Sequence, residues 1–351
     1  MNLRQVPAVT AVVATLAACG TPDGFVNASA TNGRLSARQG TVIVEACLLA
    51  PDQLASLSAP ATHRIVSDVV LRCLHFDEAG ALGTIYGPTL EAARTQVDAI
   101  HALGYRVHFA VTTVRGANPD RVIASPATWA TVATALADPA LGVDGIDVAL
   151  PVELSNNSRT AVSGLIDAIA SRVRPARTLS VWAPPSVHVP SDLPGGDAYD
   201  IPGIGPRVDR VRLMTLDFSC CGAPTGPTAD PGWSVDVARL ARSETTAAID
   251  IAVPLYGYRF EGSTRNAVPI TWYDAVTAAS NAGVSPTRDP GGELTFVDAS
   301  HFTWWYDDAQ STLRGLLAFD PATLPADVGT VFYGLGAEDP ALWTTLSGAL
   351  P

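Results

Sequence analysis

The chain contains the segment Asp144-Gly145-Ile146-Asp147-Val148-Ala149-Leu150-Pro151-Val152-Glu153, a short apolar run with acidic residues at each end. Parallel strands that are covered on both faces have this apolar character. In barrels built from such strands, the polar residues that follow a strand lie at the carboxyl-terminal mouth, where the chemistry takes place. The segment therefore predicts a barrel strand that ends in carboxylates facing a ligand.

Seven further β-rich segments accompany this one and alternate with amphipathic helical patterns. The eight expected strands are Val42–Leu48, Val66–Phe76, Tyr105–Thr112, Gly145–Leu150, Leu179–Ala183, Arg210–Phe218, Ile249–Tyr256 and Gly329–Gly334. The clearest helical patterns are Leu90–Leu103, Trp129–Ala137, Ser158–Val173 and Val235–Arg242. Eight alternating units predict an α/β fold, a (β/α)8 TIM barrel, over residues 41–351.

The segment Arg259–Trp305 interrupts this alternation. It contains a helical pattern near Tyr273–Ala282 and two β-rich runs near Leu294–Trp305. We therefore expect a small α/β insertion between the seventh strand and its helix.

The amino terminus carries a targeting signal. Arg4 precedes the apolar run Val6–Leu16, which is too short to span a bilayer, so residues 1–18 resemble a signal peptide. Leu16-Ala17-Ala18-Cys19 resembles a bacterial lipobox with Cys19 as the lipidated residue; the alternative is a coincidental cysteine. Residues 19–40 are rich in small polar residues and predict a flexible tether. We expect an exported lipoprotein, anchored to the membrane of the bacterial cell envelope.

The composition narrows the range of partners. The 351 residues include 34 acidic side chains and 22 basic ones, all arginine, for a net charge of −12. This acidity argues against nucleic acid and against electrostatic adhesion to anionic lipid, and it leaves neutral glycans as natural partners. His75 and His108 lack metal-ligand spacing, so we expect no metal and no cofactor. We also expect a monomer.

The four cysteines after Cys19 have two possible states. Cys47 and Cys73 fall on the first two expected strands, where they either form a disulfide or remain buried thiols. Cys220 and Cys221 are neighbours and either form a vicinal disulfide or stay unpaired.

Polar residues follow several expected strands. They are Asp147 and Glu153 after strand four, Asp217 after strand six, Tyr256 and Tyr258 after strand seven, and Tyr333 in strand eight. Carboxylates next to aromatic rings suit a carbohydrate, because carboxylates act on glycosidic bonds and flat rings pack on sugar faces. The alternative is that these residues are ordinary solvated loop positions.

Six segments, in the expected order, resemble glycoside hydrolase family 18, the chitinase family, and within it the branch of spore-cortex and cell-wall hydrolases. They are Asp144–Asp147, Leu179–Pro185, Val211–Phe218, Ile251–Tyr258, Thr303–Ala309 and Gly334–Trp343. The resemblance runs from about Val66 to the carboxyl terminus.

The resemblance implies substrate-assisted, retaining hydrolysis of an N-acetylated glycan such as peptidoglycan or chitin. A glutamate at the end of strand four protonates the glycosidic oxygen, and the 2-acetamido group of the substrate attacks the anomeric carbon. The resemblance also implies glycan contacts for six other side chains: Asp144, Trp182, Met214, Tyr256, Tyr258 and Tyr333.

The chain departs from the family pattern at the catalytic positions. Asp147 and Asp217 are retained, but Pro151 stands where the family has its glutamate and Ala149 where it has an aspartate. Leu216 replaces the tyrosine of strand six, and Tyr333 stands where the family usually has tryptophan.

Glu153 lies two residues beyond the expected acid and shares the strand parity of Asp147. It is either a displaced catalytic acid or a solvated loop carboxylate. Asp147 is expected to pair with Arg212 inside the barrel. Glu45 is either a displaced acid or the partner of Arg72.

Three functions therefore remain open. The first is a divergent family 18-like hydrolase, with Glu153 as proton donor and Asp147 and Asp217 as supports. The second is a catalytically inactive barrel lipoprotein that binds glycans. The third is a structural or partner-binding envelope lipoprotein that has lost the sugar site.

Overall fold

The computed structural model describes residues 40–186, 196–220, 222–262, 266–319, 324 and 327–350. The predicted signal peptide, the lipidation of Cys19, nearly all of the tether and any pairing of Cys221 lie outside the described residues.

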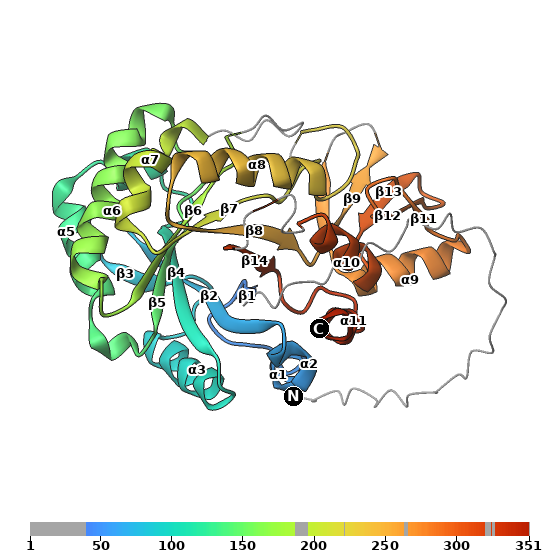
Figure 1. Cartoon of the computed structure of the whole chain (residues 1–351), viewed down its shortest axis with the longest axis horizontal. Coiled ribbons are helices and arrows are strands. Elements are labelled where there is room, and N and C mark those ends of the chain that lie inside the picture. The colour runs from blue at the N-terminus through green and yellow to red at the C-terminus, as the bar shows by residue number, and fades with distance from the viewer. Residues whose placement is uncertain are drawn as a thin grey trace, which may run out of the picture. The chain divides into compact units, whose positions relative to one another are not determined.

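Eight parallel strands form a closed barrel, which confirms the predicted (β/α)8 fold (Figure 1). The strands are β1 (Gly40–Val44), β2 (Val66–Phe76), β4 (Arg106–Thr113), β5 (Gly145–Val148), β6 (Thr178–Ala183), β7 (Arg210–Leu213), β8 (Ala248–Pro254) and β14 (Val328–Tyr333). The barrel closes because β1 pairs in parallel with both β2 and β14. A short strand, β3 (Leu82–Thr84), pairs antiparallel with β2.

Helices cover the outer face of the barrel. They are α1 (Pro51–Ser58), α2 (Pro60–His63), α3 (Leu90–Ala102), α4 (Pro119–Val122), α5 (Pro126–Leu136), α6 (Arg159–Val173), α7 (Ile201–Ile204), α8 (Pro231–Glu244), α10 (Ala309–Leu317) and α11 (Leu342–Ala349). The predicted period is visible in α6, which buries Val162, Leu165, Ile166 and Ile169. Thr89 starts α3 because its side chain accepts a hydrogen bond from the backbone N–H of Ala92.

The predicted insertion lies between β8 and α10, as expected. It is larger than the expected strand pair, because it forms a five-stranded antiparallel sheet in the order β10-β9-β13-β12-β11. Its elements are β9 (Gly257–Glu261), β10 (Ala267–Ile270), α9 (Trp272–Ala282), β11 (Thr287–Arg288), β12 (Leu294–Val297) and β13 (Phe302–Tyr306).

The insertion contacts the loop that follows β7. The buried carboxylate of Glu293 accepts hydrogen bonds from the backbone N–H and the hydroxyl of Thr228, at 2.7 to 3.0 Å. Thr228 in turn accepts a hydrogen bond from the backbone N–H of Phe218, the residue after Asp217. Burial and the neighbouring Asp307 raise the pKa of Glu293 well above its usual range. The insertion therefore helps to hold the segment that carries Asp217.

A disulfide joins Cys47 to Cys73, with 4.5 Å between their Cα atoms. Of the two states open at the sequence level, the structure has the bridge, and the alternative of two free thiols is wrong. The bridge links the end of β1 to β2 across a sequence separation of 26 residues. A closed loop of that length stabilises the fold by about 3 to 4 kcal/mol in the chain-entropy description.

The lower part of the barrel interior is a charged layer. It consists of five side chains that are at most 5% exposed: Asp68, His108, Asp147, Arg212 and Asp250. Arg212 binds Asp147 through Nε at 2.7 Å and Asp250 through Nη1 at 2.9 Å. This confirms the expected pairing of Asp147 with Arg212.

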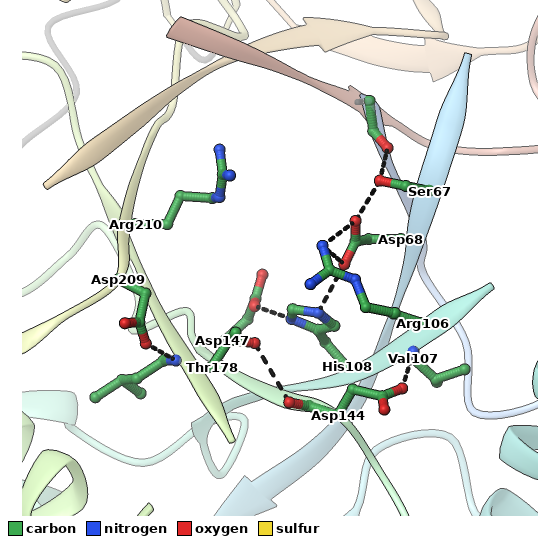
Figure 2. A network of polar contacts seen from close by, with 12 residues as sticks. Ser67, Asp68, Arg106, Val107, His108, Asp144, Asp147, Thr178, Asp209 and Arg210 are labelled. Atoms are coloured by element: carbon green, nitrogen blue, oxygen red, sulfur yellow. Dashed lines mark hydrogen bonds and ion pairs between the residues drawn. The ribbon is translucent and has the colours of Figure 1, made fainter. Parts of the chain in front are cut away.

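His108 lies between two carboxylates (Figure 2). Its Nε2 is 3.1 Å from Asp68 Oδ1, and its Nδ1 is 3.2 Å from Asp147 Oδ1. Both ring nitrogens must donate, so the imidazole is protonated. Burial would lower the pKa of His108, but hydrogen bonds to the two carboxylates outweigh it and raise that pKa. Burial would likewise raise the pKa of Asp147, but Arg212 and His108 lower it.

An apolar layer lies above the charged one. Its members come from successive strands and form one cluster: Ile43, Val70, Ala110, Ala149, Trp182, Leu216, Ala252 and Val331. Strand alternation produces this order, because residues two positions apart point to the same side. Asp147 on β5 therefore belongs to the charged layer, and Ala149, the residue that follows β5, belongs to the apolar layer.

The Asp147→Asn substitution is expected to destabilise the protein by about 3 to 5 kcal/mol, because it leaves Arg212 and His108 facing a neutral amide inside the barrel. Urea unfolding at neutral pH measures the loss. The matched control is Asp236→Asn, which breaks an exposed ion pair with Arg239 at 3.5 Å and should cost less than about 1 kcal/mol. Equal stability of the two variants would contradict the structural role of the charged layer.

Candidate functional site

A pocket of about 770 Å³ opens at the carboxyl-terminal ends of the barrel strands. It lies directly above the apolar layer, and Ile43, Ala110, Ala149 and Trp182 form part of its floor. Its size falls within the range of small-molecule sites, and its position is the one where barrels of this type bind ligands.

One wall of the pocket is aromatic. The Trp182 and Tyr333 ring centroids lie 5.8 Å apart, and those of Tyr333 and Tyr256 lie 6.2 Å apart, both in edge-on arrangements. Such a row offers apolar faces and polar edges together, a combination that suits a sugar ring.

Asp217 lies beside this wall and carries the best-defined polar group of the pocket. Tyr256 and Tyr258 both donate hydrogen bonds to its Oδ1, at 2.5 and 2.6 Å. Its backbone has a φ of 60°, which is uncommon for an aspartate and turns the chain sharply out of β7. Burial raises the pKa of Asp217, and the hydrogen bonds from the two tyrosines partly oppose this rise.

The two oxygens of Asp217 are therefore not equivalent. Oδ1 accepts both tyrosine hydroxyls, whereas Oδ2 has no hydrogen-bond partner among the described residues. Because Asp217 lines the pocket, Oδ2 is the oxygen left to accept an N–H or O–H group of a ligand.

A second polar cluster surrounds Glu45 and adjoins the aromatic wall through Tyr333. Arg72 Nη1 binds Glu45 Oε1 at 2.7 Å, and Tyr86 donates to Oε2 at 3.1 Å. Tyr333 also donates to Glu45 and accepts from Arg72 at 2.9 Å. The expected Glu45–Arg72 pair is therefore present, but it lines the pocket with side chains 37% and 35% exposed rather than lying deep inside the barrel.

A bulge in β2 positions this cluster. The pairing of β2 with β4 shifts register between Arg72 and Leu74, so both Arg72 and His75 line the pocket, although they are three residues apart. Regular alternation would have pointed one of them away.

Pro151 lines the pocket where the family pattern has its acid. It belongs to the segment after β5, and every residue from Ala149 to Glu153 lines the pocket. Proline has no proton to donate. Glu153 also lines the pocket, but it is exposed and forms no hydrogen bond or ion pair with any described residue. It therefore lacks the contacts that orient a general acid.

The structure brings together six of the nine proposed catalytic and substrate-binding residues. Those that line the pocket are Glu153, Trp182, Met214, Asp217, Tyr256 and Tyr333. Tyr258 contacts Asp217, and Asp147 lies below in the charged layer, where Arg212, His108 and Trp182 occupy its oxygens.

Asp144 lies away from the pocket. It precedes the amino-terminal end of β5, where it binds His101 at 2.8 Å and accepts a hydrogen bond from the backbone N–H of Val107 (Figure 2). A barrel strand has its ligand-facing end at the carboxyl terminus, so the expected contact of Asp144 with substrate finds no support in the structure.

Sequence reasoning did not place several polar residues at the pocket, among them Arg72, His75, Tyr86 and Arg115. Arg72 and His75 interrupt the apolar run of β2, which was a usable signal, but the bulge that turns both inward leaves no mark in the sequence. Tyr86 has a φ of 65° and precedes Gly87-Pro88, a turn signal that says nothing about a pocket.

Among the residues that the structure describes, no three His, Cys, Asp or Glu side chains are placed to hold a metal ion. Within the same residues, no helix has the length and apolar character required to cross a bilayer. The expected absence of metals and cofactors stays a prediction.

Comparisons of the sequence with protein-family models and with curated proteins found no match. Comparison with solved structures found chitinases and spore cortex-lytic enzymes. The Bacillus cereus spore cortex-lytic enzyme SleL superposes with a TM-score of 0.75 at 16% identity, over 90% of this chain and 75% of that chain. The chitinase from Chromobacterium violaceum gives 0.72 at 19% identity, over 89% and 99%.

A third similar structure contains a ligand. The class V chitinase from Nicotiana tobaccum, in complex with NAG4, gives a TM-score of 0.67 at 14% identity, over 90% of this chain and 99% of that chain. At these identities the likeness establishes a shared fold: the chain has the same barrel fold as these chitinases and SleL enzymes.

The Tyr256→Phe substitution is expected to raise the pKa of Asp217 further, because it removes a hydrogen bond that favours the charged carboxylate. Carbon-detected NMR titration of the Asp217 carboxyl group measures the shift. Tyr273→Phe is the control, since Tyr273 is 67% exposed on α9 and has no contact with Asp217. An unchanged or lower pKa in Tyr256→Phe would contradict the assigned hydrogen bond.

Proposed function

We propose that the chain binds N-acetylated glycans, of peptidoglycan or chitin type, in the pocket at the carboxyl ends of the barrel strands. The observation that carries this proposal is the combination of the Trp182–Tyr333–Tyr256 wall with the open Oδ2 of Asp217. The aromatic rings pack on a sugar ring, and Asp217 accepts the N–H of its acetamido group. The similarity in fold to chitinases supports this assignment.

Binding without hydrolysis is the activity that the geometry favours. Pro151 stands in the pocket where the family places its proton donor, and it cannot protonate a leaving group. Asp147, the carboxylate that precedes that position in the sequence, is fully buried among Arg212, His108 and Trp182. It therefore cannot reach a ligand in the pocket.

Hydrolysis with Glu153 as the proton donor is the second candidate. The observation in its favour is that Glu153 lines the same pocket as Asp217. This mechanism requires the loop after β5 to bring the exposed Glu153 carboxyl group within hydrogen-bond distance of the glycosidic oxygen. Asp217 would orient the acetamido group in either case.

Calorimetric titration of the full-length protein with NAG4, followed by mass spectrometry of the sugar, tests both candidates. Binding without hydrolysis predicts saturable heat and intact tetrasaccharide. Asp217→Ala should weaken binding by about tenfold or more, since it removes a charge-assisted hydrogen bond. Asp236→Ala, on the exposed face of α8, should leave affinity unchanged.

Each other outcome assigns a different function. Shorter sugars that disappear in Glu153→Gln would establish the hydrolase with Glu153 as its acid. Shorter sugars that persist in that variant would require a different proton donor. Absence of binding to any N-acetylated glycan would favour the structural or partner-binding envelope protein.

We further propose that Cys19 is lipidated and anchors the chain, as a monomer, to the membrane of the cell envelope. The lipobox-like Leu16-Ala17-Ala18-Cys19 supports this proposal, and residues 19–40 are long enough to separate the barrel from the lipid surface. Metabolic labelling with an alkyne fatty acid should mark the wild-type protein in the membrane fraction. Label that remains after Cys19→Ser would refute the assignment.

A further inference from the structure

One wall of the pocket carries more positive than negative charge. The ends of β1 and β2 and the loop after β4 form this wall, and its charged side chains are Glu45, Arg72 and Arg115. Burial and Glu45 raise the pKa of Tyr86 on the same wall, whereas Arg72 and Arg115 lower it. Both guanidinium groups therefore act on one hydroxyl, and Glu45 can neutralise only one of them.

Arg115 is the cation that remains uncompensated. Arg72 is held by Glu45 at 2.7 Å, whereas Arg115 is exposed and forms no hydrogen bond or ion pair with any described residue. Glu153 lies on the neighbouring loop and also lines the pocket, yet it does not form an ion pair with Arg115. Asp217 stands with its two tyrosines near the aromatic wall.

The backbone fixes the position of Arg115 at the pocket. Val114 donates a hydrogen bond to the carbonyl of Phe76 at 2.9 Å, which ties the loop to the end of β2. A turn then runs from Val114 to Ala117, with a φ of 83° at Gly116. A side chain other than hydrogen at Gly116 would strain this turn, so the arginine is presented by a defined structure.

The charge of the ligand follows from this arrangement. Of the two arginines that line the pocket, Arg72 has a carboxylate partner and Arg115 has none among the described residues. Guanidinium groups bind carboxylates through two parallel hydrogen bonds, and the pocket itself supplies no carboxylate to Arg115. An anionic group of the ligand would therefore be the partner of Arg115.

We propose that Arg115, with Arg72 beside it, binds a carboxylate carried by the sugar, so that the preferred ligand is an acidic N-acetylated glycan. This inference rests on the proposed function and specifies its ligand class. The lactyl group of a muramic acid and a uronic acid each carry a carboxylate that could bind Arg115 in this way. A neutral chitin-type chain offers Arg115 only hydroxyl and carbonyl oxygens.

Four tetrasaccharides of equal length test the proposal by calorimetric titration of the full-length protein. They are NAG4, an alternating N-acetylglucosamine–N-acetylmuramic acid chain, an alternating N-acetylglucosamine–glucuronic acid chain, and the muramic acid chain with its carboxylates converted to amides. At least one acidic chain should bind about tenfold more tightly than NAG4, the gain expected from one charge-assisted contact. The amide form should lose that gain.

Arg115→Gln should remove the preference for the acidic chain and leave the affinity for NAG4 unchanged. Arg172→Gln is the matched control, because it removes the same charge from an exposed arginine near the end of α6 that does not line the pocket. It should retain the preference. The acidic chain that binds more tightly identifies which carboxylate is recognised.

The failure of this inference is distinguishable from failure of the proposed function. If NAG4 and both acidic chains bind equally, the pocket binds N-acetylated glycans and the role of Arg115 is refuted. The same conclusion follows if Arg115→Gln weakens all four sugars to the same extent. If none of the four sugars binds, the proposed function is refuted and the inference falls with it.

Discussion

The ion pair between Arg212 and Asp147 is the constraint on which the rest of the barrel depends. Both side chains are at most 1% exposed, and taking two charges out of water costs several kcal/mol per ion unless further hydrogen bonds satisfy them. His108 and Trp182 supply those bonds to Asp147, and Asp250 supplies one to Arg212. A shift of β5 by one residue would turn Asp147 toward the covering helices and away from Arg212. The charged layer therefore fixes the register of β5.

That register also sets where the chain reaches the pocket. Asp147 lies below, Ala149 is in the apolar layer, and the residues that follow, Pro151 and Glu153 among them, line the pocket. In a continued strand, Glu153 would lie about 6.6 Å further out, and proton transfer needs hydrogen-bond contact of about 3 Å. The strand in fact ends at Val148, so only the following loop controls the carboxyl group of Glu153.

The barrel could be predicted from the sequence because buried parallel strands leave long apolar runs, and eight of them alternate with helical periods. The local geometry could not be predicted from the sequence. The expected strand Arg210–Phe218 ends at Leu213, and four residues later the backbone of Asp217 is left-handed, with a φ of 60°. The two β-rich runs of the insertion became part of a five-stranded sheet, since β9 follows β8 almost directly and pairs with both β10 and β13.

The same division applies to the site. Asp217 and the aromatic residues could be found because they end strands, and all parallel strands end at one mouth. The positions of Arg72 and Arg115 at the pocket could not be predicted, because Arg72 reaches it through a register shift and Arg115 lies on a loop. Asp144 was misplaced for the opposite reason: motif resemblance placed it at the sugar, but it stands at the far end of β5.

A binding barrel and a hydrolase use such a pocket differently. A hydrolase gains rate only from contacts that are stronger in the transition state than with the bound substrate, so firm contacts to the resting sugar contribute little to turnover. A barrel without a proton donor has no such limit, and every contact with the resting sugar adds to affinity. Asp217 on one side and Arg115 on the other can then hold one ligand at two points, by its acetamido N–H and by its carboxylate. Two fixed points select the orientation of a sugar as well as its charge. Under the proposed binding function, specificity should therefore appear in the strength of binding rather than in the speed of a reaction.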